Sequence, residues 1–150
     1  MERITYQDIP DGMFQKLKNI EDFINQSPLN ESLLKLIKLR VSQINGCAYC
    51  VDMHYKELKH INETELRLSS LVVWKETPYF SEKERAVLNF SETLTQIDNT
   101  PINNEIYKTL EEYFSKSEIC YITLAITQIN TWNRLMKTFL FTPGNYKVSM

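Results

Sequence analysis

Two cysteines and a histidine stand close together in the stretch from Leu39 to Leu58. Cys47 and Cys50 are three positions apart, and His54 follows four positions after the second cysteine. On a helix these spacings place side chains on one face. The reactive form of cysteine is the thiolate, and a helix N-terminus or a nearby basic group lowers the thiol pKa from its ordinary value of about 8.5. The residue types and their spacing therefore predict a redox-active dithiol assisted by a histidine.

Gly46 indicates where the helix that carries this dithiol begins. A glycine can end a helix in the left-handed conformation, so the segments before Gly46 and from about Ala48 onward are expected to be separate helices. Cys47 and Cys50 would then lie at the N-terminus of the second helix. The helix dipole is positive there and favours a thiolate.

A zinc site and an inert pair of packed cysteines are the alternative interpretations of the same residues. Structural zinc normally takes four protein ligands, and neither a second CxxC motif nor an HxxxH motif is present to complete a set. Cys120 lies in an apolar helical stretch and is expected to be a buried small hydrophobe. His60 falls at an expected helix end and is expected to be solvated. We therefore favour the redox interpretation and expect neither a metal nor a cofactor.

The composition is that of an ordinary globular protein. The chain has 150 residues, of which 43% are hydrophobic and 24% charged, and its formal net charge is −2. This length predicts a single domain over residues 1–150. The charge offers no basic patch for nucleic acid, and no apolar run has the length of a membrane span or a signal-peptide core. We expect a cytoplasmic protein, a setting in which a CxxC pair is more often redox-active than a structural disulfide.

The elements around the dithiol are expected to be helices. Glycine is scarce, with three in the chain, and apolar residues recur at helical spacing almost throughout. The expected helices cover about residues 13–24, 30–45, 48–60, 62–74, 81–97, 106–113 and 118–140. Three pairs have the spacing of a capping box, namely Asn62 with Glu65, Ser81 with Glu84, and Ser115 with Glu118. The sequence predicts an all-α fold of six or seven helices.

The last expected helix, from about Glu118 to Leu140, is apolar on two sides. A helix that is apolar all round is usually buried. In so small a domain, that pattern indicates a subunit interface as much as an internal core. We therefore expect a homo-oligomer.

Several motifs together resemble those of the alkylhydroperoxidase core family, the AhpD-like branch of the carboxymuconolactone decarboxylase superfamily. The specific motifs are Lys38–Leu39–Arg40, Ser42–Gln43–Ile44–Asn45–Gly46–Cys47, Cys50 and Asp52–Met53–His54; supporting ones are Glu76–Thr77–Pro78, Phe80–Ser81–Glu82, Ile129–Asn130 and Trp132–Asn133–Arg134. The similarity covers roughly residues 10 to 143. It implies an all-helical trimer, or a hexamer built from dimers, that acts as an antioxidant, peroxiredoxin-like alkyl hydroperoxide reductase.

In the scheme that this resemblance implies, a hydroperoxide substrate oxidises Cys50, paired with His54, to a sulfenic acid. Cys47 then condenses with it to form a disulfide. An external dithiol, from a protein or of the lipoyl type, resets the pair by exchange. Cys47 adjoins Gly46, where one expected helix ends and the next begins. We therefore expect Cys47 to lie nearer solvent and to form the mixed disulfide with the reductant.

The chain departs from the peroxidase pattern at two positions. The pattern has a glutamate of the proton relay twelve positions before the first cysteine, where this chain has Lys35, and it has a histidine where this chain has Tyr49. Glu31 and Glu57 are the candidates to replace the glutamate. The alternative functions are a thiol–disulfide oxidoreductase and a non-catalytic oligomer that senses oxidation. Decarboxylation of a muconolactone is disfavoured, because that branch does not depend on a CxxC motif.

Overall fold

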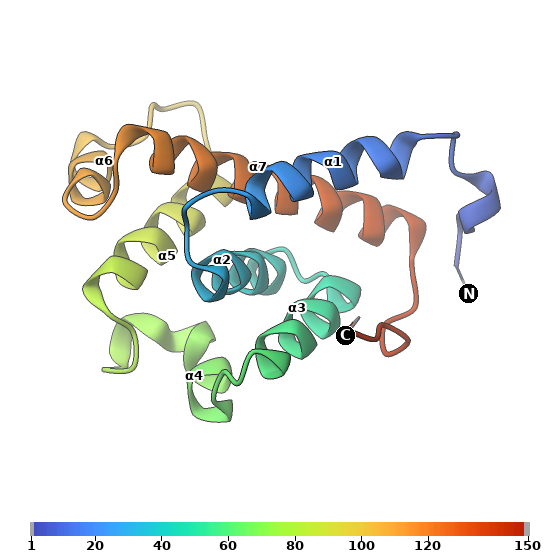
Figure 1. The fold of residues 1–150 in the computed structure, drawn as a ribbon, viewed down its shortest axis with the longest axis horizontal. Helices are drawn as coiled ribbons and strands as arrows, with labels where there is room; N and C mark the ends of the chain where they lie inside the picture. Colours follow the sequence, from blue (N-terminus) through green and yellow to red (C-terminus); the bar gives the residue numbers. More distant parts are fainter. Residues whose placement is uncertain (1, 149–150) are drawn as a thin grey trace.

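The computed structural model describes residues 2–148, and within them it contains seven α-helices, two short 3₁₀ helices and no strand (Figure 1). The helices are α1 (Met13–Asn25), α2 (Glu31–Ile44), α3 (Ala48–His60), α4 (Glu65–Ser70), α5 (Glu82–Thr95), α6 (Asn104–Glu111) and α7 (Lys116–Phe139), with the 3₁₀ helices η1 (Tyr6–Asp8) and η2 (Leu71–Glu76). The predicted all-α fold is confirmed.

Two of the three predicted capping boxes are present and start α5 and α7. The Ser81 hydroxyl accepts from the Glu84 backbone N–H at 3.2 Å, and the Glu84 carboxylate accepts from the Ser81 N–H at 2.8 Å. Ser115 and Glu118 repeat the arrangement at 3.2 and 2.8 Å. Each box satisfies backbone donors that the first helical turn leaves without partners.

The third predicted box, at Asn62, is wrong. Asn62 has a φ of +66°, so it lies in the left-handed region directly after α3. Asparagine adopts this conformation more readily than most residues. Thr64 caps α4 instead, and its hydroxyl accepts from the Arg67 N–H at 3.3 Å. The fourth helix is also shorter than predicted: α4 ends at Ser70, and the chain continues as the 3₁₀ helix η2, in which Val73 is non-helical.

The helix α2 lies in the centre of the molecule and contacts α3, α5 and α7 (Figure 1). Helix α1 runs beside α7 along one side. The largest apolar cluster joins α2, α5 and α7 and includes Ile37, Val87, Ile122 and Ile126, none of which exposes surface. Burying a side chain of this size contributes about 1.5–3 kcal/mol, so this cluster holds α2, α5 and α7 together.

Both sides of α7 are used within the chain itself. Ile122 and Ile129 face the large core, whereas Trp132, Leu135 and Phe139 pack against a smaller cluster around the two cysteines. The apolar second side of α7 is therefore covered at least partly by this chain's own segments. The expected oligomer stays a prediction.

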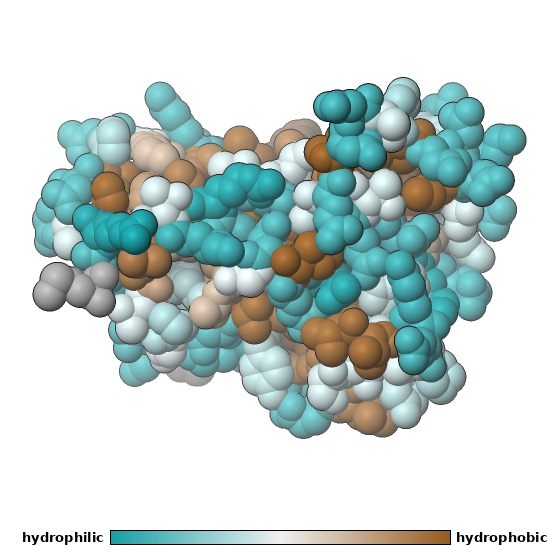
Figure 2. Space-filling view, turned by 180° about the vertical axis from the view of Figure 1, so that it is seen from behind, coloured by the Kyte–Doolittle hydropathy of each residue, from teal (hydrophilic) through white to brown (hydrophobic). Residues whose placement is uncertain are grey.

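Exposed apolar side chains occur elsewhere. Leu66 on α4 and Val72 and Val73 on η2 are each more than half exposed. Figure 2 shows the face turned away in Figure 1, where apolar surface forms separate patches among hydrophilic side chains. None of the helices within residues 2–148 combines the length and the apolar character that crossing a bilayer requires.

Candidate active site

The two cysteines lie at the start of α3, as predicted. Gly46 has a φ of +61°, a conformation that side chains of L-residues rarely adopt, and it turns the chain sharply after α2. Cys47 is the N-cap residue of α3, and Cys50 is in the first turn. Both thiols are free. The positive end of the helix dipole is therefore directed at the dithiol.

Both cysteines are buried, with 1% of each exposed. The prediction that Cys47 lies nearer solvent is wrong. Met136 of α7 and Phe141, just after that helix, form one buried cluster with the two cysteines. A break between two helices does not ensure that the residue beside it is exposed, because a segment distant in sequence can cover that residue.

Cys50, but not Cys47, lines a cavity of about 560 Å³. Its walls come from α1, α2, α3, α7 and the segments before α1 and after α7; besides Cys50 they include Tyr6, Phe14, Lys18, Glu21, Asp22, Asn25, Lys35, Lys38, Tyr49, Met53, His54, Glu57, Trp132, Met136 and Phe141. A predominantly apolar cavity with a few convergent polar groups is typical of a small-molecule site.

Aromatic rings form one side of this cavity. Phe14 lies edge-on to Trp132, with ring centroids 5.3 Å apart, and Phe141 lies edge-on to Tyr49 at 5.8 Å. Glu21 of α1 accepts from the Trp132 indole N–H at 3.1 Å and fixes that ring. These rings come from four different segments, so only the folded chain assembles them.

His54 lies on the cavity wall and is 4% exposed. Its Nδ1 is 2.8 Å from Glu57 Oε2, while its Nε2 is buried and has no hydrogen-bond partner within residues 2–148. Burial lowers the pKa of His54, against the opposing influence of Glu57. A neutral imidazole that donates from Nδ1 keeps a lone pair at Nε2. His54 can therefore accept a proton at Nε2.

Glu57 is held as a carboxylate by three neighbours. Burial alone would raise its pKa, but the hydrogen bond from His54, the positive charge that His54 carries in acid, the charge of Lys35 and the hydroxyl of Tyr146 together bring the pKa to about 2. Lys35 Nζ is 3.6 Å from Oε2, and the Tyr146 hydroxyl donates to Oε1 at 3.1 Å. Of the two carboxylates that the sequence offered as replacements, Glu57 contacts His54. Glu31 pairs with Lys35 at 3.4 Å, and its side chain is 69% exposed.

The pKa values of the two thiols are shifted in opposite directions. Donation from Cys50 lowers the pKa of Cys47 to about 7 despite burial, with smaller contributions from Asn133 and Lys137. Donation to Cys47 and burial raise the pKa of Cys50. Of the two thiols, Cys47 is therefore the one that loses its proton more readily, and Cys50, which lines the cavity, is the one that retains it.

The three residues of the Trp132–Asn133–Arg134 motif, one of those that support the family resemblance, lie in three different environments. Trp132 lines the cavity, and Arg134 is exposed. Asn133 is fully buried; it accepts from the Asn45 amide at 2.9 Å and donates to the Ser42 hydroxyl at 3.0 Å. This buried amide ties α7 to the turn that carries the cysteines.

The remaining candidates lie outside the cavity. His60 is exposed at the end of α3, as predicted. Cys120 is exposed on α7, so its predicted burial is wrong. Within residues 2–148, no three His, Cys, Asp or Glu side chains are grouped as ligands for one metal ion.

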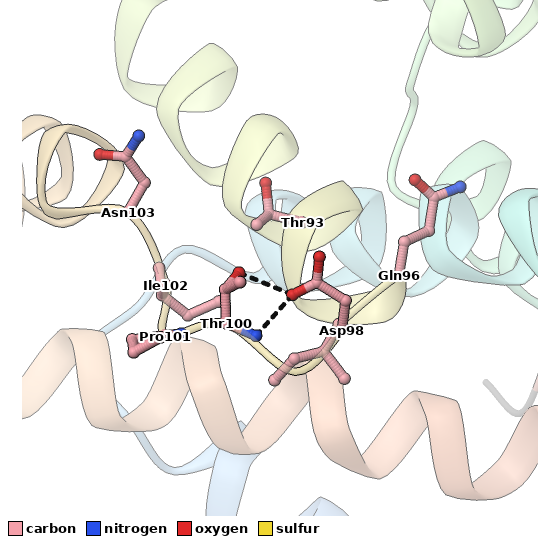
Figure 3. A pocket seen from close by; sticks show the side chains of 8 residues that line it. Thr93, Gln96, Asp98, Thr100, Pro101, Ile102 and Asn103 are labelled. Atoms are coloured by element: carbon pink, nitrogen blue, oxygen red, sulfur yellow. Dashed lines mark hydrogen bonds between the residues drawn. The ribbon is translucent and has the colours of Figure 1, made fainter.

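A second hollow, of about 320 Å³, lies at the loop between α5 and α6 (Figure 3). Asp98 accepts there from the backbone N–H and the hydroxyl of Thr100, at 2.7 and 2.6 Å. Its lining contains no cysteine, histidine or lysine. These hydrogen bonds of Asp98 and Thr100 stabilise the turn of the loop itself.

The all-helical fold with a dithiol at the N-terminus of α3 defines an AhpD-like protein. The chain matches the sequence model of the carboxymuconolactone decarboxylase family over residues 12–93 and belongs to that family. It is 38% identical to the uncharacterised protein YdfG of Bacillus subtilis over 135 residues. This match covers 89% of this chain and 91% of that protein.

Solved structures share the fold. One is a protein of unknown function from Agrobacterium tumefaciens whose suggested identity is the antioxidant defence protein AhpD. It is 39% identical, with a TM-score of 0.91 over 97% of this chain and 100% of that chain. A peroxidase-related protein of Ralstonia eutropha with an alkylhydroperoxidase AhpD core has a TM-score of 0.78 at 20% identity, over 88% of this chain and 70% of that chain. At that identity the likeness concerns the fold.

Proposed function

We propose that this protein is a CxxC-dependent alkyl hydroperoxide reductase, with Cys50, His54 and Cys47 as its catalytic residues. The observation that carries the proposal is that Cys50 and His54 line one cavity, that His54 Nε2 is buried without a hydrogen-bond partner, and that Cys47 packs in the same buried cluster as Cys50. The cavity gives a substrate access to one sulfur and keeps the second within reach for disulfide formation.

The first step oxidises Cys50. His54 Nε2 accepts the Cys50 proton, and the thiolate attacks the terminal oxygen of the hydroperoxide. The O–O bond breaks, an S–O bond forms, and the alkoxide leaves as an alcohol with the proton that His54 returns. Two electrons pass from sulfur to the peroxide, and Cys50 becomes a sulfenic acid.

The second step forms the disulfide. The Cys47 thiolate attacks the Cys50 sulfur, the S–O bond breaks, a disulfide S–S bond forms, and the hydroxide takes up a proton from solvent and leaves as water. The helix N-terminus and the Asn133 amide favour the Cys47 thiolate that this step needs. Two successive exchanges with an external dithiol then return both cysteines to thiols.

The lining of the cavity favours organic hydroperoxides as substrates. Phe14, Trp132 and Phe141 offer apolar surface to an alkyl or aryl group. Because both cysteines are only 1% exposed, a slender lipoyl-type dithiol would reach them more easily than a CxxC motif on a folded protein. We also expect the protein to form a homotrimer or a hexamer, to work in the cytoplasm, and to bind neither nucleic acid nor membrane.

One observation favours a second candidate, a redox sensor without turnover. Position 35 holds a lysine, which when protonated cannot accept a proton as a carboxylate does. In a sensor the dithiol would be oxidised once and would reset slowly.

Turnover distinguishes the two functions. We expect the wild type to consume many equivalents of cumene hydroperoxide with dihydrolipoamide as reductant, and Cys50→Ser to consume none. Cys120→Ser is the matched control, because Cys120 is exposed on another helix; its rate should equal that of the wild type. Consumption that stops after one equivalent per dithiol, with reductant in excess, would instead establish the sensor.

A further inference from the structure

The chain after α7 folds back onto α3 and is tied to it by polar contacts. We call residues 141–148 the strap, and in Figure 1 this segment lies beside α3. Lys56 donates to the carbonyl oxygens of Gly144 and Tyr146, both at 3.1 Å. Asp52 pairs with Lys56 at 2.9 Å and accepts from the Gly144 N–H at 3.1 Å. Helix α3 therefore holds the strap through one lysine and one aspartate.

This attachment brings the Tyr146 hydroxyl to the site. The hydroxyl donates to Glu57 Oε1 at 3.1 Å, while the other carboxylate oxygen, Oε2, lies 2.8 Å from His54 Nδ1. Each oxygen of Glu57 thus has its own partner. Burial and the Glu57 charge raise the pKa of Tyr146 to about 12, so the phenol stays a donor at every pH at which the enzyme would work.

We propose that Tyr146 is a positioning residue of the peroxide reaction. Its hydroxyl holds the Glu57 carboxylate in place, and Glu57 in turn orients His54, whose Nε2 is the base. This inference rests on the proposed function. Tyr146 lies outside residues 12–93, the range that the family model matches. The strap thus lies outside the matched range, and its Tyr146 begins a chain of contacts that runs through Glu57 to His54.

The competing explanation is that Tyr146 only anchors the strap. Tyr146→Phe separates the two roles, because it removes the hydroxyl and leaves the ring and the backbone contacts with Lys56. If Tyr146 positions Glu57, the first-turnover rate with cumene hydroperoxide should fall about tenfold, a part of the roughly 10²–10⁴-fold that a positioned general base contributes. The melting temperature should stay within a few degrees of the wild type.

A double-mutant cycle with Glu57→Gln tests whether the effect passes through Glu57. We expect Tyr146→Phe to slow the reaction in the wild-type background and to have no further effect in the Glu57→Gln background. Tyr107→Phe, on the surface of α6, is the control and should react at the wild-type rate. An unchanged rate for Tyr146→Phe, or an equal fall in both backgrounds, overturns the inference. If the wild type and the Tyr107→Phe control also fail to react, the proposed function itself is wrong.

Discussion

Lys35 Nζ lies 3.6 Å from the Glu57 carboxylate, across the contact between α2 and α3. The resemblance to peroxidases predicts a carboxylate at position 35, and this chain has the opposite charge there. The carboxylate that contacts His54 comes instead from α3, and the lysine helps to keep it ionised. The site therefore retains a carboxylate beside its histidine, supplied by a different helix.

Reversing the charge at position 35 should destabilise the protein. Lys35→Glu would place a third carboxylate between Glu31 and Glu57. Exposed ion pairs contribute about 0.2–1 kcal/mol and breaking buried ones costs about 3–5 kcal/mol. For this half-buried cluster we expect the free energy of unfolding in urea to fall by roughly 1–3 kcal/mol. Lys16→Glu, the same change on the exposed side of α1, is the control. Equal stability of the two variants would show that Lys35 does not stabilise Glu57.

Trapping the sulfenic acid should identify the cysteine that meets the peroxide. In a Cys120→Ser background, which removes the exposed thiol, Cys47→Ser treated with less than one equivalent of hydroperoxide should carry a dimedone label on Cys50, detected by mass spectrometry. We expect this because Cys50 lines the cavity and Cys47 does not. A label on Cys47 in the Cys50→Ser protein, together with no label on Cys50 in the Cys47→Ser protein, would instead mean that the lower pKa of Cys47 decides the site of attack.

Removing the imidazole should slow the first step without unfolding the protein. His54→Ala is expected to reduce the rate of peroxide reaction by about 10²–10⁴-fold, measured by stopped-flow, with an unchanged helical circular dichroism spectrum. His60→Ala, at the exposed end of the same helix, should react like the wild type. A His54→Ala rate within a factor of two of the control would remove His54 from the mechanism.

Acid should slow the reaction only below the ordinary pKa of histidine. Burial lowers the pKa of His54 from 6.5, so its base form persists as the pH falls through that value, and the rate should decline only at more acidic pH. A decline centred above pH 6.5 would contradict the assignment of His54 as the base.

Stability should follow pH in the same direction. The unfolded chain binds protons on His54 and Glu57 at higher pH than the folded chain does, so the free energy of unfolding should fall as the pH falls below 6.5 and fall further between 4.5 and about 2. Urea titrations at a series of pH values measure this slope. Glu57→Gln should flatten the lower part of it, and an unchanged slope would mean that Glu57 is not held ionised.

Gly46→Ala should destabilise the turn that carries the cysteines. An added Cβ would meet only Lys137 Nζ, at 3.8 Å, so space is not the obstacle. The cost comes from the φ of +61°, and we expect a loss of about 1–2 kcal/mol. Gly144→Ala has the same kind of backbone, with a φ of +98° and nothing near the added atom, but it lies in the strap. It should therefore affect the melting temperature less than Gly46→Ala does.

The sequence by itself determined the local features of this protein. The helix starts at Ser81 and Ser115, the turn at Gly46 and the placement of Cys47 and Cys50 at a helix N-terminus were all predicted, and the structure confirms them. Each depends on backbone conformation and on hydrogen bonds that span at most a few positions. Such interactions are readable along the chain. The single wrong cap, Asn62, failed because a left-handed residue and an N-cap favour the same residue type.

Only the tertiary structure decided how the site is closed and what holds its carboxylate. Phe141, just after α7, belongs to the cluster that buries Cys47, and Tyr146 reaches Glu57 across 89 positions of sequence. The contact between Glu57 and His54 follows from their i, i+3 spacing on α3, whereas the packing of α2 against α3 brings Lys35 within 3.6 Å of Glu57 and leaves Glu31 in solvent. The contacts between segments depend on how whole helices lie against one another, and spacing along a single helix does not specify that.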